Sequence, residues 1–259
     1  MGGAFAVVVM FVGLGVLAGV GAGAAEAASD PAVMSSKCPG NLRGSGPGTI
    51  IFTFDDGHYT DLKAAEILER RGYCGTFYIT TDFLRTGGRK YHLSADEVRN
   101  LADRGHDIQS HTVTHPDLLT LSDAQVRSEL SQSKNTLQTI TGQPVTHFAY
   151  PFGRYDDRVK RLTAEQYETG RAAYLGLCCG LDTTDRYQLA AISITKDTTT
   201  AEAKGYVDLA IREDRPVIFV FHQIKNGPGP YDWTPGKLTE LVDYAAQKNV
   251  PVRTIDQRF

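Results

Sequence analysis

The chain has 259 residues, of which 41% are hydrophobic and 22% are charged, so it is long enough to bury a complete core in one domain. Its formal net charge is −3, and it carries no long basic run, which excludes the usual electrostatic footprint of a nucleic-acid-binding protein. The mean hydropathy is −0.25 and the sequence holds one long apolar stretch, which excludes a protein with many membrane spans.

The chain begins with an uncharged segment whose first charged side chain is Glu26. An apolar core from Ala4 to Val20 is followed by small residues as far as Ala27, which predicts a signal peptide over residues 1–27. A membrane anchor is the alternative, because the apolar core is close to the length of a spanning helix. We therefore expect a protein that is secreted or held at the cell wall, with a membrane-anchored form as the other possibility.

Four cysteines, Cys38, Cys74, Cys178 and Cys179, allow one or two disulfides in an exported chain. A bridge between the two adjacent cysteines is disfavoured, because their Cα atoms lie only about 3.8 Å apart. The favoured pairing joins Cys38 or Cys74 to one of the adjacent pair, and buried thiols are the alternative.

Residues 28–48 are rich in Ala, Ser, Gly and Pro and are expected to form a linker or an irregular N-terminal wrap. Short apolar runs then alternate with amphipathic stretches. Strands are expected at 49–54, 75–79, 106–110, 148–150, 172–177, 189–194, 217–221 and 250–254, and helices at 61–71, 94–104, 122–141 and 234–248. Seven or eight strands that alternate with helices predict an α/β fold with a parallel sheet, closed into a (β/α) barrel in preference to an open doubly wound sheet.

Acidic and imidazole side chains follow two of these strands. Asp55 and Asp56 end the first strand, where their mutual repulsion favours a bound cation, although an Asp-Gly turn has the same sequence. His111 and His115 follow the third strand four residues apart. Two imidazoles and one carboxylate would make a three-ligand site with open positions, which is typical of catalytic zinc.

Two further strand ends carry candidates for the same site. Tyr150-Pro151-Phe152-Gly153 can present backbone N–H groups beside it, although a Pro-Gly turn has the same pattern. His222 ends the most apolar strand, so its imidazole is expected to emerge where the other strand ends converge, unless it is a core histidine bonded to the backbone.

In combination these motifs resemble the polysaccharide deacetylase family, also called the NodB-homology or carbohydrate esterase 4 family, over roughly residues 49–256. The family's T-F-D-D-G motif stands at 53–57, its two-histidine box at 111–115, its Pro-aromatic-Gly motif at 151–153 and its final apolar-x-His motif at 220–222. The resemblance implies a distorted or incomplete (β/α) barrel of about seven parallel strands, with residues 49–259 as the catalytic domain.

The resemblance also implies a role for each motif residue. Asp56, His111 and His115 would hold a divalent metal, zinc first or otherwise Co²⁺, Ni²⁺ or Mn²⁺. Asp55 would be the general base and His222 the general acid. Tyr150, Pro151, Phe152 and Val220 would form the oxyanion and substrate-binding positions.

One feature of the family pattern is missing. Many members carry an arginine just before the Pro-aromatic-Gly motif, where this chain has Ala149, and a second place that could supply one, residues 189–191, reads Leu-Ala-Ala. Arg154, Arg186 and Lys196 are the candidates to replace the arginine that orients the base.

Aromatic side chains after the strand ends are candidates to stack on sugar rings. They are Tyr59, Tyr155, Tyr231 and Trp233, of which Trp233 is the preferred one, and loop packing is the alternative for each.

The expected function is a secreted, metal-dependent enzyme that hydrolyses the N-acetyl groups of chitin, poly-N-acetylglucosamine or peptidoglycan. O-deacetylation of acetylxylan by the same site is the alternative, followed by a catalytically impaired carbohydrate-binding protein. The expected partner is a polysaccharide or oligosaccharide, with no nucleic acid and no protein partner implied.

Overall fold

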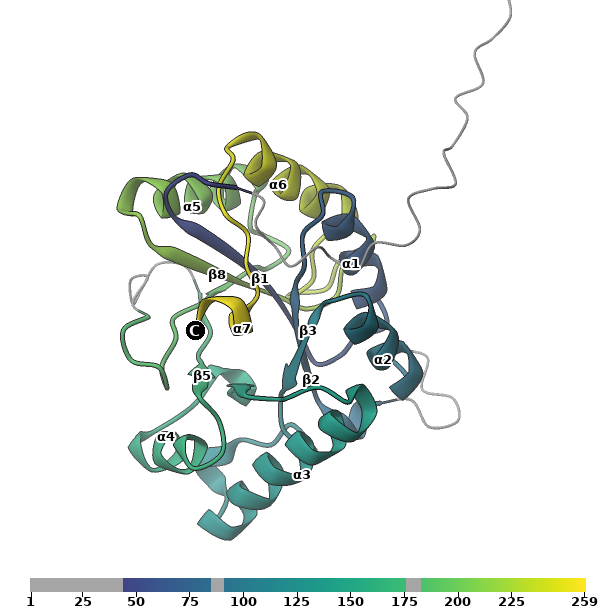
Figure 1. The fold of residues 1–259 in the computed structure, drawn as a ribbon, viewed down its shortest axis with the longest axis vertical. Coiled ribbons are helices and arrows are strands. Elements are labelled where there is room, and N and C mark those ends of the chain that lie inside the picture. The colour runs from purple at the N-terminus through teal and green to yellow at the C-terminus, as the bar shows by residue number, and fades with distance from the viewer. Residues whose placement is uncertain (1–43, 85–90, 176–182) are drawn as a thin grey trace, which may run out of the picture. The chain divides into compact units, whose positions relative to one another are not determined.

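The computed structural model describes residues 44–84, 91–175 and 183–259 (Figure 1). The predicted signal peptide, most of the predicted linker and three of the four cysteines lie outside these residues, so those expectations stay predictions. Cys74 is described and is buried. Within the described residues, none of the helices has the length and apolar character needed to cross a membrane.

Eight strands and seven α-helices make up the described domain. The strands are β1 (Thr49–Asp55), β2 (Thr76–Ile79), β3 (Asp107–Ser110), β4 (His147–Ala149), β5 (Thr169–Arg171), β6 (Tyr174–Leu175), β7 (Ile192–Ser193) and β8 (Pro216–Phe221). The helices are α1 (Asp61–Glu69), α2 (Ala95–Asp103), α3 (Asp123–Thr141), α4 (Asp157–Ala164), α5 (Thr200–Glu213), α6 (Pro235–Gln247) and α7 (Ile255–Arg258).

The strands are all parallel and form one sheet in the order β5-β4-β3-β2-β1-β8-β7-β6. The two ends of this order, β5 and β6, are successive parts of one stretch of chain, separated by two residues. A parallel bridge joins Arg171 of β5 to Leu189, and the same segment continues into β7. The sheet therefore curls back on itself as a distorted barrel of about seven strands, as the sequence predicts.

Three predicted strands differ from the structure. The strand expected at 189–194 is shortened to Ile192–Ser193, with a separate bridge at Leu189. In place of the strand expected at 172–177, the chain forms two short strands, β5 and β6, and the first of them begins at Thr169. β5 begins there because it pairs with β4 from His147 onward. The strand expected at 250–254 is reduced to a single bridge between Ile50 and Val252. Helices α4 and α5 were not delimited from the sequence.

Hydrogen-bonded caps fix where the helices begin. The predicted capping boxes are confirmed: Ser94 pairs reciprocally with Glu97 at α2, and Ser122 with Gln125 at α3. The predicted N-cap of α6 is confirmed as well, with Thr234 accepting from the backbone of Lys237. Each cap satisfies backbone N–H groups that the first helical turn leaves without partners.

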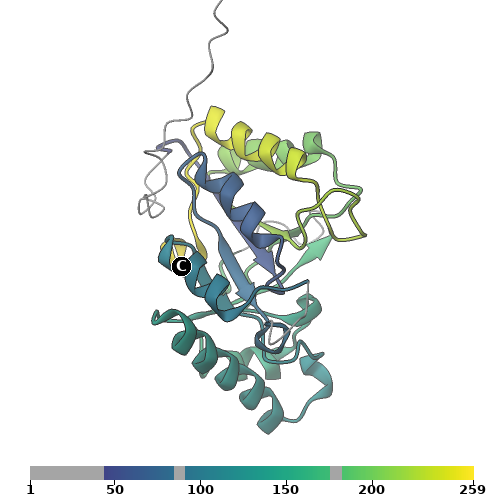
Figure 2. The ribbon, with the colours of Figure 1, turned by 90° about the vertical axis from the view of Figure 1, so that its right-hand side faces the viewer.

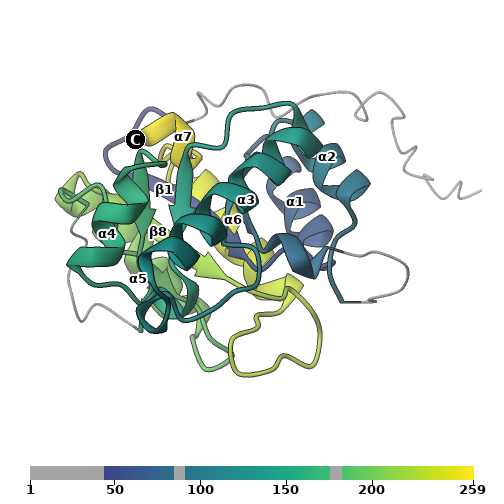
Figure 3. The same cartoon turned by 90° about the horizontal axis from the view of Figure 1, so that it is seen from below.

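The helices surround the strands. In Figure 2 α1 and α6 run side by side, and α6 also packs on α5; in Figure 3 the helices lie outside β1 and β8. The strand faces that point outward pack on these helices in one large apolar cluster. A smaller cluster fills the barrel interior and includes Ile51, Tyr78, Ile218 and Ile255.

The short helix α7 closes the amino end of the barrel, where it lies central in Figure 1. The backbone N–H of Ile255 donates to Thr76 Oγ1 at 3.0 Å, and that of Asp256 to Asp107 Oδ2 at 3.3 Å. Thr76 and Asp107 begin β2 and β3, so the amino ends of the strands are covered. The carboxyl ends remain as the open face, where the loops of a parallel barrel carry its chemistry.

Candidate active site

A cavity of about 410 Å³ opens at the carboxyl ends of the strands. It brings together side chains that are far apart in the sequence but lie at or after the carboxyl ends of β1, β3, β4, β5, β7 and β8. The lining residues are Asp55, Asp56, His111, His115, Tyr150, Phe152, Gly153, Ala173, Ser193, His222 and Tyr231.

Asp56, His111 and His115 form a triad whose ligand atoms all lie within 4.8 Å of one another. Nε2 of His111 lies 3.5 Å and Nε2 of His115 lies 3.4 Å from Oδ1 of Asp56. That oxygen is buried and has no hydrogen-bond partner among the described residues. A buried carboxylate oxygen facing two imidazole nitrogens fits a divalent cation, and this donor set leaves coordination positions for water and substrate.

Hydrogen bonding orients His111 for this role. Its Nδ1 lies 2.8 Å from the carbonyl oxygen of Ala149 and donates to it, which leaves the lone pair of Nε2 directed at Asp56. Burial, moderated by the nearby carboxylates, lowers the pKa of His111 to about 4, so the ring is neutral at pH 7 and able to bind a metal.

The second oxygen of Asp56 faces another histidine. Oδ2 lies 3.3 Å from Nε2 of His58, whose ring stacks on that of His92 with centroids 4.9 Å apart. Burial raises the pKa of Asp56, but His58 together with His111, His222 and His115 outweighs burial and holds that pKa well below its usual value. His58 was not singled out from the sequence, although it directly follows the Asp-Asp-Gly motif.

His115 is held by a loop that Glu129 of α3 organises. The Glu129 carboxylate accepts from the backbone N–H groups of Val113 and Thr114, at 2.8 and 2.9 Å, and from the Thr114 hydroxyl at 2.8 Å. The backbone N–H of His115 donates to Thr112 Oγ1 at 3.0 Å. The loop geometry is therefore set by side chains and not by a helical turn.

Backbone strain is concentrated at the site. Among the described non-glycine residues with positive φ are Asp56 at 75°, Thr112 at 70°, His115 at 58° and Phe152 at 59°. Such conformations cost about 1–3 kcal/mol each and persist where the surrounding structure over-determines them. All four belong to the motifs that the sequence identified.

Asp55 is held by an arginine that the sequence analysis missed. Nη2 of Arg171 lies 2.5 Å from Oδ1 and 2.6 Å from Oδ2 of Asp55, and the Arg171 side chain is fully buried. Arg171 ends β5, which is not next to β1 in the sheet, so its side chain reaches Asp55 across the barrel. The sequence does contain a feature that could have pointed to Arg171: it is a charged residue that directly precedes the apolar Ala-Ala-Tyr-Leu run, which the sequence predicts to be a strand.

The three expected replacements for the missing arginine are therefore wrong. Arg154 pairs with Asp117 at 2.6 Å, and Arg186 lies near Glu168 and the C-terminal carbonyl. Lys196 is exposed on its loop. None of the three contacts Asp55.

A third carboxylate lies behind the pair. Asp61, the first residue of α1, is fully buried, and neither of its carboxylate oxygens has a hydrogen-bond partner among the described residues. Burial raises its pKa well above the usual range, and the charges of Asp56 and Asp55 add to that effect.

His222 also lines the cavity. Its Nδ1 is buried and has no hydrogen-bond partner among the described residues. Tyr231 lies beside it, with ring centroids 5.7 Å apart and 55% of its surface exposed.

The structure contradicts the expected stacking role of Trp233. Its side chain is 1% exposed, its ring packs on Phe221 with centroids 5.7 Å apart, and its Nε1 donates to the carbonyl oxygen of Thr198 at 3.0 Å. A buried indole cannot offer a face to a sugar. Of the four aromatic candidates, Tyr231 lines the cavity instead, whereas Tyr155 bonds to Tyr174 inside the loops.

Of the other expected substrate-binding residues, two line the cavity and two do not. Tyr150 and Phe152 line the cavity, and Phe152 is 63% exposed with its ring 4.6 Å from that of His115. Pro151 and Val220 are buried and do not belong to the cavity lining, and Val220 packs in the barrel interior.

This fold and site define a parallel barrel with a candidate metal-assisted hydrolytic centre at its open end. Residues 43–169, just under half of the chain, match the model of the family described as polysaccharide deacetylase. That range contains Asp55, Asp56, His111 and His115.

Two curated relatives match part of the chain. A peptidoglycan-N-acetylmuramic acid deacetylase of Bacillus subtilis is 30% identical over 119 residues, 44% of this chain and 42% of the relative. A chitin deacetylase of Arthroderma benhamiae is 31% identical over 120 residues, 46% of this chain and 31% of the relative. The match thus spans less than half the length of these relatives.

Solved structures extend the likeness. A polysaccharide deacetylase from Bacillus cereus is 30% identical with a TM-score of 0.52, over 59% of this chain and 49% of that one. The Xyl-CE4 domain of a multidomain xylanase from the hindgut metagenome of Trinervitermes trinervoides is 16% identical with a TM-score of 0.59, over 82% of this chain and 89% of that one. This second likeness concerns the fold alone, and it reaches past the segment that the family model matches.

Proposed function

We propose that the protein is a metal-dependent deacetylase that hydrolyses the N-acetyl groups of a glycan containing N-acetylglucosamine and releases acetate. The observation that carries the proposal is the cavity that holds Asp55, the metal-ligand triad and His222 together. The match to the polysaccharide deacetylase family model and to the deacetylase relatives supports a hydrolase of polysaccharide acetyl groups.

A divalent ion held by Asp56, His111 and His115 would supply polarisation of the acetyl carbonyl and a lowered pKa of a nearby water. Asp55 would take the proton of the attacking water on its carboxylate. Arg171 keeps that carboxylate in one orientation through its two short contacts.

The leaving group needs a proton, because an amine anion does not depart at neutral pH. The imidazole of His222, which lines the cavity, would deliver that proton to the nitrogen. The backbone N–H of Phe152 has no acceptor among the described residues and would donate to the developing oxyanion. A protonated His222 is needed for an amide far more than for an ester, which favours N-deacetylation over O-deacetylation.

Zinc is the proposed metal, because two imidazoles and a carboxylate form the donor set of many catalytic zinc sites. We also propose that the protein acts outside the cell, since the predicted signal peptide fits a polymeric substrate that a cell does not take up.

The test is acetate release from oligomers of N-acetylglucosamine and from acetylxylan by the purified zinc-loaded protein. We expect release from the oligomers, and we expect Asp55→Asn to abolish it while leaving metal content unchanged. Release from acetylxylan alone would identify an esterase and overturn the N-deacetylase proposal.

A further inference from the structure

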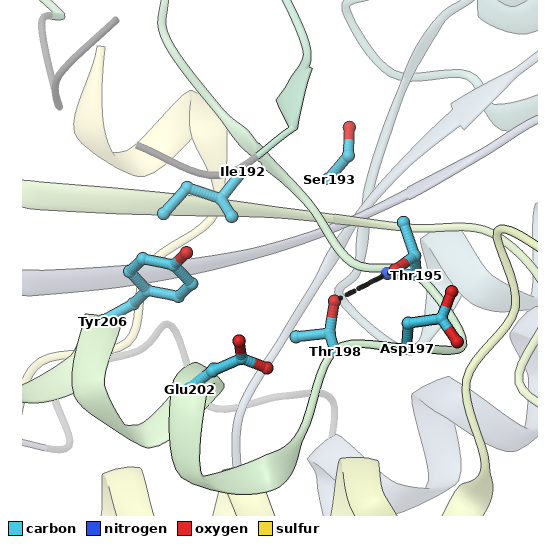
Figure 4. Close-up of a pocket in the computed structure, with 7 residues that line it drawn as sticks. All are labelled: Ile192, Ser193, Thr195, Asp197, Thr198, Glu202 and Tyr206. Carbon is cyan, nitrogen blue, oxygen red and sulfur yellow. Dashed lines mark hydrogen bonds between the residues drawn. The ribbon is translucent and has the colours of Figure 1, made fainter. Parts of the chain in front are cut away.

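A second cavity, of about 330 Å³, lies between the end of β7 and the first turns of α5 (Figure 4). We call it the side cavity. Ser193 lines both the side cavity and the catalytic cavity, so the two adjoin. Ser193 pairs with Val220, two residues before His222, which places the side cavity on the His222 side of the site. Its volume is at the lower end of the range of about 300–1,000 Å³ for small-ligand sites.

The walls of the side cavity combine an aromatic ring with polar groups that the fold does not use. In Figure 4 Tyr206 and Glu202 of α5 lie on one side, and Ser193 and Thr195 on the other. Among the described residues, the Tyr206 hydroxyl makes no hydrogen bond, whereas the Ser193 hydroxyl points away from Tyr206 in Figure 4. Ile192, which is buried, adds an apolar surface beside them. A ring face with a few hydrogen-bonding groups is the chemistry that binds a sugar ring and its hydroxyls.

Only one of the two carboxylate oxygens of Glu202 takes part in capping helix α5. Its Oε2 accepts from the backbone N–H of Thr199 at 2.7 Å and from the Thr199 hydroxyl at 2.9 Å. Oε1 has no hydrogen-bond partner in the described part of the chain, and it can therefore accept from a ligand hydroxyl. Asp197 also lines the cavity, but in Figure 4 its carboxylate points away from Tyr206.

The far wall is fixed before any ligand binds. Thr198 is held through its carbonyl oxygen, which accepts from Trp233 Nε1 at 3.0 Å and from Lys237 Nζ at 2.9 Å. The backbone N–H of Lys196 donates to the carbonyl of Pro230 at 3.1 Å, which ties this loop to the segment that carries Tyr231. A wall that is already ordered reduces the entropy lost on binding.

We propose that the side cavity is a sugar-binding subsite, which holds a hexopyranose unit of the glycan next to the unit that loses its acetyl group. This inference rests on the proposed function. The nitrogen that accepts a proton from His222 is attached to the sugar ring, so that ring lies on the His222 side of the metal ligands. The next ring of the chain then reaches the side cavity past Ser193, where it stacks on Tyr206 and hydrogen-bonds to Glu202.

The experiment compares kcat/KM for the tetramer of N-acetylglucosamine with that for 4-nitrophenyl acetate, which is too small to reach the side cavity. The full-length zinc-loaded protein is compared with Tyr206→Ala. We expect kcat/KM for the tetramer to fall about tenfold, because the stacking surface is lost, and that for the small ester to stay within about twofold. The matched control is Asp157→Ala, an exposed position on α4, which should change neither value.

A double variant, Tyr206→Phe with Glu202→Gln, covers the case in which Tyr206→Ala does not fold. It keeps the ring and the cap, since glutamine caps helices at Gln125 and Gln257 of this chain, and a drop of about threefold with the tetramer alone is expected. Equal loss on both substrates, or no loss on either, would overturn the subsite. Failure of the wild-type protein to release acetate from the tetramer would instead overturn the proposed function, and the subsite with it.

Discussion

Arg171 and Asp55, which are 116 residues apart in the chain, form a buried ion pair in which one guanidinium nitrogen lies 2.5 and 2.6 Å from the two carboxylate oxygens. The guanidinium also stacks over the ring of Tyr78 at 4.9 Å. Asp55 thus meets the cavity in one fixed orientation, which is what a general base requires.

Arg171→Met should lower kcat for acetate release by at least about 100-fold, because the base is no longer oriented. It should also lower the free energy of unfolding by about 3–5 kcal/mol, because the Asp55 charge is left buried without its partner. Acetate release and denaturant unfolding measure the two effects.

The double variant Arg171→Met with Asp55→Asn separates these effects. It should regain much of the lost stability, since no unpaired charge remains, and none of the activity. If Arg171→Met alone kept wild-type turnover, the positioning role of Arg171 would be wrong.

His58→Ala should weaken metal binding by about 10- to 100-fold, because its imidazole holds the oxygen of Asp56 that faces away from the other two ligands. The measurement is a zinc competition titration with a fluorescent chelator. His92→Ala, which changes the neighbouring ring but no contact to Asp56, is the control. Equal zinc affinity in His58→Ala and the wild type would remove His58 from the metal centre.

Trp233→Ala should cost about 3–5 kcal/mol of unfolding free energy, because a fully buried ring is lost. Tyr231→Ala should cost under about 1 kcal/mol and should raise KM for N-acetylglucosamine oligomers instead, because Tyr231 is exposed beside His222. Thermal unfolding and oligomer kinetics test the pair. A destabilised Tyr231→Ala protein with unchanged KM would contradict the assignment of Tyr231 to substrate binding and would place it in the core instead.

His147 should make stability depend on pH in mildly acidic solution. Burial lowers its pKa to about 4 in the folded protein, against 6.5 for the exposed group. Between pH 6.5 and 4 the unfolded chain binds this proton and the folded one does not, so stability falls as the pH falls, by about 1.4 kcal/mol per pH unit. The slope of unfolding free energy against pH should be smaller by that amount in His147→Gln. Identical slopes in the two proteins would contradict the buried, neutral His147.

Much of the site could be predicted from the sequence because its residues directly follow strands. Asp55 and His111 stand at strand ends that the apolar runs mark, and the ends of parallel strands meet at one face. Arg171 could not be found in this way, because its role depends on the register between β5 and β4, and the predicted strand began one residue too late to include it.

The choice of Trp233 over Tyr231 failed for a different physical reason. The two residues lie two apart in one loop, and composition does not say which side chain turns inward. The hydrogen bond from the Trp233 indole to Thr198 and its packing on Phe221 decide that question, and both contacts come from other elements.

The most direct test of the account is the dependence of acetate release on metal. The full-length protein is stripped with a chelator, assayed on the N-acetylglucosamine tetramer, and then reloaded with zinc. The account predicts one tightly bound ion per chain, loss of acetate release on stripping, recovery on reloading, and neither tight binding nor activity in His111→Ala. Full activity in the verified metal-free protein would contradict the account.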